Sequence, residues 1–143
     1  LQKKYNYINP NTLTTLGYFY MLKGNYEKAI ELTNSALKDN EEYAPAWDNL
    51  GQIYYNQGDY KKAYENFQKA IDYRENMVES LYYMALLEEN EGNIEKAKEL
   101  LADTGKSIAE IADAVGYHDT RHFSKLFTRN IGLKPSEYRK LYS

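Results

Sequence analysis

The sequence predicts an all-α fold, and three observations support this class. Apolar residues recur at the three- and four-residue spacing of amphipathic helices along most of the 143 residues. Only 8 glycines and 3 prolines are present, as expected for a folded globular chain. A short motif also returns every 34 residues, which is the period of stacked helical hairpins.

Composition and charge narrow the class of protein and suggest two parts. The chain has no cysteine, which excludes disulfides, thiolate chemistry and Cys-based metal sites. It has neither an apolar run long enough to span a membrane nor a signal-peptide pattern, so we expect a cytoplasmic protein with no membrane partner. Residues 1–102 carry a net charge of −5 and residues 103–143 carry +2, and 13 of the 16 tyrosines precede residue 103. We therefore predict two domains, 1–102 and 103–143.

The repeated motif begins with a glycine and occurs at residues 24–29, 58–63 and 92–97. Each glycine can turn the chain, and the residue after it is a good helix N-cap. An alanine follows one turn inside the helix, where a bulky side chain would separate the paired helices. Each copy therefore predicts a turn between two helices, with N-caps at Asn25, Asp59 and Asn93.

The second copy carries the fullest pattern, with Trp47, Leu50, Gly51 and Tyr54 in the first helix and Ala63 and Phe67 in the second. This order resembles the tetratricopeptide repeat. The resemblance covers roughly residues 10–102 and implies three stacked repeats. Their expected bounds are 10–43, 44–77 and 78–102, the last being shortened.

The first residues suggest that the array continues upstream. Residues 1–7 look like the tail of a preceding helix, with Asn9 as the cap and Pro10 as the first residue of the next helix. Since the chain begins with Leu1 rather than Met, we expect a fragment of a longer repeat array.

The resemblance also implies a binding groove. In tetratricopeptide repeats the first helices usually line a concave groove that binds a peptide, and tyrosine supplies rigid contact area with a polar tip. The alternative is that these tyrosines belong to ordinary surface or inter-repeat packing. The groove residues that the resemblance implies, for a peptide or protein ligand, are Thr14, Tyr18, Gln52, Tyr55, Tyr82 and Tyr83.

The last forty residues follow a different pattern. A helix stop at Asp103-Thr104-Gly105, where Gly105 is free to adopt the left-handed conformation, precedes a capping box of Ser107 and Glu110. A short amphipathic helix then runs to Gly116, and Asp119 can cap another helix after a tight turn. Two short helices joined in this way, the second with a basic polar face, indicate a helix-turn-helix.

The residues of this part closely resemble AraC-type transcription regulators. The match rests on Ser107–Tyr117, Phe123–Phe127 and Glu137–Arg139, and it extends over about residues 94–143. The resemblance implies double-stranded DNA as a partner and makes helix 93–102 the linker helix of the family. The expected fold is therefore a tetratricopeptide superhelix of helical hairpins followed by a small helix-turn-helix subdomain that shares this helix.

One departure from the AraC pattern affects the expected affinity. That family joins two helix-turn-helix units through the linker helix, and this chain has tetratricopeptide repeats where the first unit would be. A natural fusion and an engineered splice both fit this overlap. In either case the remaining half of the domain should bind DNA weakly.

The outward face of the predicted second helix carries the candidate DNA contacts. Arg121 is the best base reader because its guanidinium can grip guanine O6 and N7 together, whereas Arg129 is expected at a phosphate. The alternative is a basic face that is only solvated. The candidate residues are Thr120, Arg121, Ser124, Lys125 and Arg129.

We expect no enzyme, metal site or cofactor. His118 and His122 have the spacing of two metal ligands, but the cap at Asp119 places His118 outside the helix and no third ligand is near in the sequence. Phosphate loops and nucleophile–base patterns are not apparent. The favoured function is a DNA-binding transcription-regulator module whose repeats bind a peptide or protein or mediate assembly. The alternative is a protein-interaction scaffold in which the helix-turn-helix is only a structural C-terminal cap.

Overall fold

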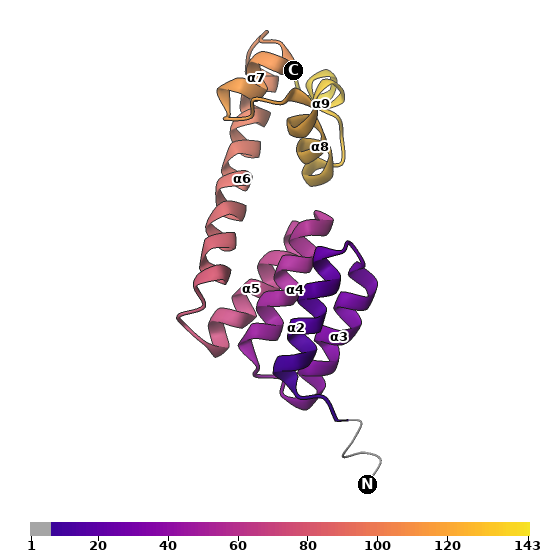
Figure 1. Cartoon of the computed structure of the whole chain (residues 1–143). Coiled ribbons are helices and arrows are strands. Elements are labelled where there is room, and N and C mark those ends of the chain that lie inside the picture. The colour runs from indigo at the N-terminus through magenta and orange to yellow at the C-terminus, as the bar shows by residue number, and fades with distance from the viewer. Residues whose placement is uncertain (1–6) are drawn as a thin grey trace. The chain divides into compact units, whose positions relative to one another are not determined.

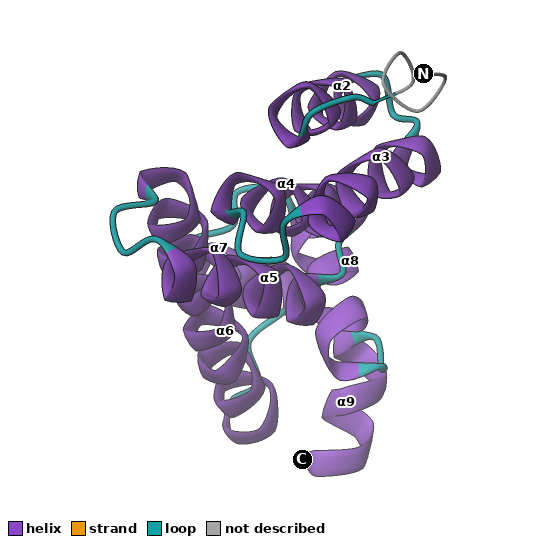
Figure 2. Ribbon diagram, turned by 90° about the horizontal axis from the view of Figure 1, so that it is seen from below, coloured by secondary structure: helices purple, strands orange, loops and turns teal. Residues whose placement is uncertain are grey.

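The computed structural model describes residues 7–143, and every regular element in this range is an α-helix (Figures 1 and 2). The predicted all-α class is therefore confirmed. Of the helix tail predicted at residues 1–7, all but Tyr7 lies outside the described residues. The helices are α2 (Pro10–Leu22), α3 (Tyr26–Asp39), α4 (Ala44–Gln57), α5 (Tyr60–Tyr73), α6 (Val78–Asp103), α7 (Ile108–Ala114), α8 (Thr120–Ile131) and α9 (Pro135–Tyr142).

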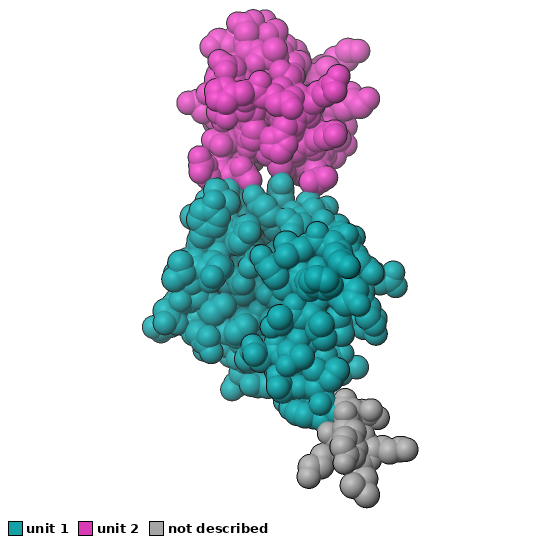
Figure 3. Space-filling model, in the orientation of Figure 1, with its two compact units in different colours: residues 1–87 teal, residues 88–143 magenta. Residues whose placement is uncertain are grey.

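The chain forms two compact units, which are described separately (Figure 3). Unit 1 comprises residues 1–87 and unit 2 comprises residues 88–143. The division falls inside α6, so the first part of this helix belongs to unit 1 and its second part to unit 2.

Unit 1 is built from two helical hairpins, α2–α3 and α4–α5, and the first part of α6 (Figure 1). Gly24 and Gly58 turn the chain with φ of 81° and 82°, values that favour glycine. The predicted caps follow them, because the side chains of Asn25 and Asp59 accept hydrogen bonds from backbone N–H groups at the starts of α3 and α5. The cap at Asn9, with Pro10 in the first turn of α2, is confirmed as well.

Close helix approach holds each hairpin together. A Cβ atom on Gly51 of α4 would lie 2.5 Å from the ring of Phe67 on α5, and one on Gly17 would collide with the Thr33 side chain. The glycines are thus required by the approach of the second helix, as the sequence pattern predicts. Neighbouring hairpins are joined by apolar clusters, such as the one that contains Met21 of α2, Ala29 of α3, and Leu50 and Ile53 of α4.

The third hairpin does not form, and the predicted turn at Gly92 with a cap at Asn93 is wrong. Residues 78–103 make one continuous α-helix of 26 residues. A glycine inside a helix costs about 1 kcal/mol relative to alanine, which favourable packing can outweigh. Here Ile94, Ala97 and Leu101 are buried, and this burial outweighs the local preference for a turn.

Within the described residues, no helix is both long enough and apolar enough to cross a bilayer. The longest, α6, carries many charged side chains.

In unit 2, α7, α8 and α9 follow α6 (Figure 1). The predicted capping box is present, since the Ser107 hydroxyl accepts from the Glu110 N–H at 3.1 Å and the Glu110 carboxylate accepts from the Ser107 N–H at 3.2 Å. These hydrogen bonds lower the pKa of Glu110. Gly116 turns the chain after α7 with φ of 96°, and Asp119 caps α8 as predicted.

Gly105 differs from the expectation, because it does not take a left-handed conformation. Instead, the Thr104 hydroxyl donates to the Leu100 carbonyl at 2.6 Å, and α9 supplies a side chain that binds the carbonyls beyond the end of α6. A tertiary contact therefore takes over the role that the sequence suggested for a glycine turn.

A buried carboxyl group links α4 to α6 in unit 1. Asp48 accepts hydrogen bonds from the Ser80 hydroxyl at 2.6 Å and from the Gln52 amide at 2.8 Å. Burial raises the pKa of Asp48 despite these bonds, with Glu79 contributing in the same direction. The folded state therefore holds this proton more tightly than the unfolded chain does.

From this raised pKa we predict that the Asp48 contribution to stability falls as pH rises from the unfolded pKa, near 3.8, through the folded pKa. Asp48→Asn keeps a hydrogen-bonding side chain without a charge, so its stability relative to wild type should increase across this window. Urea unfolding at a series of pH values measures the effect. A difference between the two proteins that does not change with pH would contradict the prediction.

Candidate functional site

The candidate nucleic-acid interface is built on α8. Phe123, Leu126 and Phe127 are buried along one side of this helix. The rings of Phe123 and Phe127 lie 5.8 Å apart, and Phe127 meets Tyr138 of α9 edge to face at 5.6 Å. These contacts fix which side of α8 faces solvent.

All five predicted DNA contacts lie on α8. Arg121, Lys125 and Arg129 are exposed and follow one another at intervals of one turn, while Thr120 and Ser124 are partly buried. The Asp119 carboxylate binds the backbone N–H of Arg121, so the cap leaves the guanidinium free to extend from the first turn. The structure thus presents a cationic stripe along the exposed side of α8.

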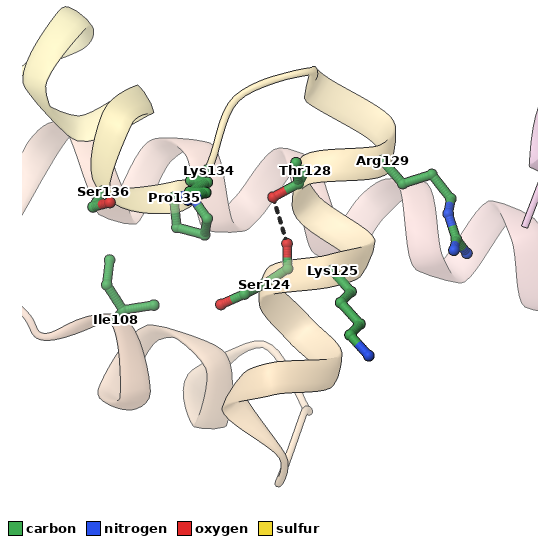
Figure 4. A pocket seen from close by; sticks show the side chains of 8 residues that line it. All are labelled: Ile108, Ser124, Lys125, Thr128, Arg129, Lys134, Pro135 and Ser136. Carbon is green, nitrogen blue, oxygen red and sulfur yellow. Dashed lines mark hydrogen bonds between the residues drawn. The ribbon is translucent and has the colours of Figure 1, made fainter.

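An open groove of about 600 Å³ runs between α8 and its neighbours in unit 2 (Figure 4). Lys125 and Arg129 extend from α8 in the same general direction, and Ser124 points toward Ile108. The Thr128 hydroxyl donates to the Ser124 carbonyl at 2.7 Å, which ties it to its own helix. The groove is lined by Ile108, Ser124, Lys125, Thr128, Arg129, Lys134, Pro135 and Ser136.

Lys134 and Ser136 were missed by the sequence analysis. Both lie at the start of α9, where Pro135 occupies the first turn, and they bring a third lysine or arginine and a hydroxyl to the groove. Pro135 could have predicted a helix start here. Only the packing of α9 on α8 brings that helix start beside Lys125 and Arg129.

Arg139 has a structural role in the same unit. Its Nε donates to the Leu101 carbonyl at 3.2 Å, and its Nη2 donates to the carbonyls of Thr104 and Lys106 at 3.4 and 2.5 Å. One guanidinium therefore binds carbonyls at the end of α6 and in the loop that follows. A second link joins the Tyr117 hydroxyl to the Asn90 side chain of α6 at 3.2 Å.

The groove residues predicted in unit 1 separate into two groups. Thr14 and Gln52 are buried and engaged inside the unit: the Thr14 carbonyl accepts from the Asn49 amide at 2.7 Å, and Gln52 donates to Asp48. Tyr18 and Tyr82 are exposed, and Tyr55 and Tyr83 are partly buried.

The four tyrosines are near one another. The rings of Tyr55 and Tyr83 are 5.0 Å apart, those of Tyr82 and Tyr83 are 5.5 Å apart, and Tyr83 stacks on Phe67 at 5.1 Å. Burial raises the pKa of Tyr83, and Tyr18, Asp48 and Tyr82 add to this shift. The hydroxyl of Tyr83 is therefore neutral at physiological pH, and the exposed part of the cluster is uncharged and aromatic.

Within residues 7–143, no three His, Asp or Glu side chains gather in a way that could hold a metal ion. His118 is almost fully exposed and lies 3.7 Å from the Asp113 carboxylate.

Comparison with known families divides the chain in the same way as the sequence patterns do. Residues 91–141 match the family described as "Helix-turn-helix domain". Residues 44–76 match "Tetratricopeptide repeat" and residues 17–58 match "TPR repeat". The chain therefore combines tetratricopeptide repeats with a helix-turn-helix domain, and both predicted resemblances are confirmed.

The similar curated proteins are transcription regulators. An uncharacterized HTH-type transcriptional regulator of Escherichia coli K12, YdiP, is 48% identical over 46 residues, 32% of this chain and 15% of the regulator. The MmsAB operon regulatory protein of Pseudomonas aeruginosa is 47% identical over 44 residues, 31% and 14% of the two chains. The uncharacterized HTH-type regulator YisR of Bacillus subtilis is 47% identical over 47 residues, 33% and 16%. Each match thus spans about one-seventh of the relative's length.

The contrast between two arginines of unit 2 gives a prediction. Arg139→Ala should destabilise unit 2 by about 1–3 kcal/mol, because it removes charged hydrogen bonds to backbone carbonyls. Arg129→Ala removes an exposed charge and should change stability by less than about 0.5 kcal/mol. Thermal unfolding followed by circular dichroism measures both variants, and equal losses would contradict the structural role of Arg139.

Proposed function

We propose that the chain is a DNA-binding transcription-regulator module whose helix-turn-helix contacts duplex DNA through α8. The observation that carries the proposal is the exposed stripe of Arg121, Lys125 and Arg129 on a helix whose opposite side is locked into the unit 2 core. The similarity of this part to transcription regulators supports the same function.

The residues have different roles in this proposal. In helix-turn-helix proteins, the N-terminal residues of the second helix contact base edges in the major groove. Arg121 and Thr120, in the first turn of α8, are therefore assigned to bases, and Ser124 and Lys125 lie one turn further on. Arg129 and Lys134, which line the same groove, are assigned to phosphates because they lie beyond the first turns of α8.

A single unit of this size should bind weakly. It offers few phosphate contacts, and binding of this kind has dissociation constants of about 10⁻⁴–10⁻⁶ M at physiological salt. The proposal is therefore tested at low salt, where counterion release makes the binding stronger.

We predict that Arg121→Ala weakens binding to a preferred duplex by about 1–3 kcal/mol, whereas Arg129→Ala lowers the salt dependence by about one charge. The matched control is Arg74→Ala, which removes the same charge from an exposed site in unit 1. Fluorescence anisotropy with labelled duplexes at several salt concentrations measures each variant.

The result also distinguishes the alternative function. If the intact chain does not bind any duplex at low salt, or if Arg74→Ala and Arg121→Ala weaken binding equally, the DNA-binding proposal fails. The protein-interaction scaffold, with the helix-turn-helix as a structural cap, then becomes the better account.

We infer further that unit 1 binds a peptide or protein through its tyrosine cluster. Tyr82 is 60% exposed and its ring lies against that of Tyr83, so a large aromatic surface is available without prior rearrangement. Such rigid aromatic residues are common anchors of interfaces. The burial of Thr14 and Gln52 limits the proposed contact surface to Tyr18, Tyr55, Tyr82 and Tyr83.

For a peptide selected on the intact chain from a random library, Tyr82→Ala should weaken binding by at least about 1–2 kcal/mol. Tyr73→Ala is the matched control, since Tyr73 is exposed to a similar degree on α5. Isothermal titration calorimetry compares the two variants. An affinity unchanged by Tyr82→Ala would exclude this surface as the binding site of that peptide.

A further inference from the structure

The two complete hairpins show which residues of a first helix are covered by its second helix. Leu13 of α2 is buried in a cluster with Ala36 of α3. Ala44 of α4 is buried in a cluster with Ala70 of α5, against which Trp47 also packs. In both hairpins, the same register of the first helix therefore rests against an alanine of the second helix.

The corresponding residues of α6 are uncovered. Val78 and Leu81 lie 34 residues after Ala44 and Trp47, and they are 70% and 48% exposed. Ala85 occupies the register of the buried glycines at 17 and 51 and is also exposed. We call Val78, Leu81 and Ala85 the open face of α6.

The repeat register also identifies the segment that would cover this face. Ile94, Ala97 and Leu101 correspond to Tyr60, Ala63 and Phe67, through which α5 closes the second hairpin. All three are buried in this structure, although the third hairpin is not closed. One side of a helix cannot pack against two partners at once, so burial within unit 2 and closure of the hairpin exclude each other.

The sequence at the middle of α6 keeps the chemistry of a turn. Gly92-Asn93 matches Gly24-Asn25 and Gly58-Asp59, where the chain turns and the second residue caps the next helix. A Cβ atom on Gly92 would meet nothing within 4 Å, so packing does not require a glycine here. The continuous helix thus has a glycine that only the turn would use.

We propose that α6 is a two-state element, in which residues 93–104 pack either into unit 2 or back onto the open face of α6 as the second helix of a third hairpin. The closed state removes Ile94, Ala97 and Leu101 from unit 2. The helix-turn-helix then loses part of its core, so the continuous helix is the state competent for DNA. This last consequence rests on the proposed function, whereas the two states of α6 do not.

A distance measurement separates the two states. The chain has no cysteine, so Glu79→Cys and Asp103→Cys allow spin labels at two exposed sites only. In a continuous helix, the two sites are about 36 Å apart, from the rise of 1.5 Å per residue. In a closed hairpin they lie within about 20 Å, because packed helices are about 10 Å apart. Electron–electron double resonance on the labelled intact chain reports both populations.

Two substitutions shift the equilibrium in opposite directions. Gly92→Ala should reduce the short-distance population about fivefold, since alanine favours a helix interior by that factor. Glu95→Pro should increase it about a hundredfold, because proline breaks a helix interior and is tolerated in a first turn. Glu95→Ala is the control, since it removes the same contact between Glu95 and Lys98 without breaking the helix.

A short-distance population that dominates in Glu95→Pro and decreases in Gly92→Ala supports the proposal. Long distances alone in wild type and Glu95→Pro overturn it, as does an equal short-distance fraction in wild type and Gly92→Ala. The second comparison stays decisive if Glu95→Pro does not fold.

Duplex DNA provides a separate arm of the experiment. If DNA binds only the continuous state, its addition should deplete the short-distance population by mass action. A shift between the variants without any effect of DNA would retain the two-state helix and refute the link to DNA binding. DNA binding without any shift between the variants would refute the switch and leave the proposed function intact.

Discussion

The structure depends on which partner covers one side of α6. Ile94, Ala97 and Leu101 carry the small and apolar pattern of a repeat helix, yet they are buried with α6 continuous through Gly92. Burial of an aliphatic side chain stabilises a fold by about 1.5–3 kcal/mol, more than a single glycine in a helix costs. The continuity of α6 and the open face of its first part both follow from this difference.

The carbonyls near the end of α6 show a related dependence on tertiary contacts. A helix end leaves carbonyl groups without partners inside the helix, and local sequence commonly satisfies them through a left-handed glycine. Here Arg139 binds the carbonyls of Leu101, Thr104 and Lys106 from α9, more than thirty residues away. The same side chain therefore joins the last helix to the end of α6, and it supports α8 indirectly by holding α9.

The two units use charge in different ways. Unit 1 buries a carboxyl group, Asp48, whose hydrogen bonds to Ser80 and Gln52 link α4 with α6. Unit 2 keeps Lys125, Arg129 and Lys134 at an open groove, where they are exposed and able to meet an anionic surface. The net negative charge of the whole chain thus hides a local positive surface, which suits a nucleic-acid partner better than the overall composition suggests.

The sequence alone determined the all-α class, the glycine turns of the first two hairpins, the capping box at Ser107 and the exposed stripe of α8. Each of these depends on residues within about one or two helical turns of each other, so local chemistry is sufficient. Tertiary structure decided the rest. The continuity of α6, the role of Arg139, the burial of Thr14 and Gln52, and the addition of Lys134 to the groove all depend on residues brought together from distant parts of the chain. The motif at residues 92–97 satisfies two packing patterns equally well, and only the free energy of burying its apolar side could choose between them.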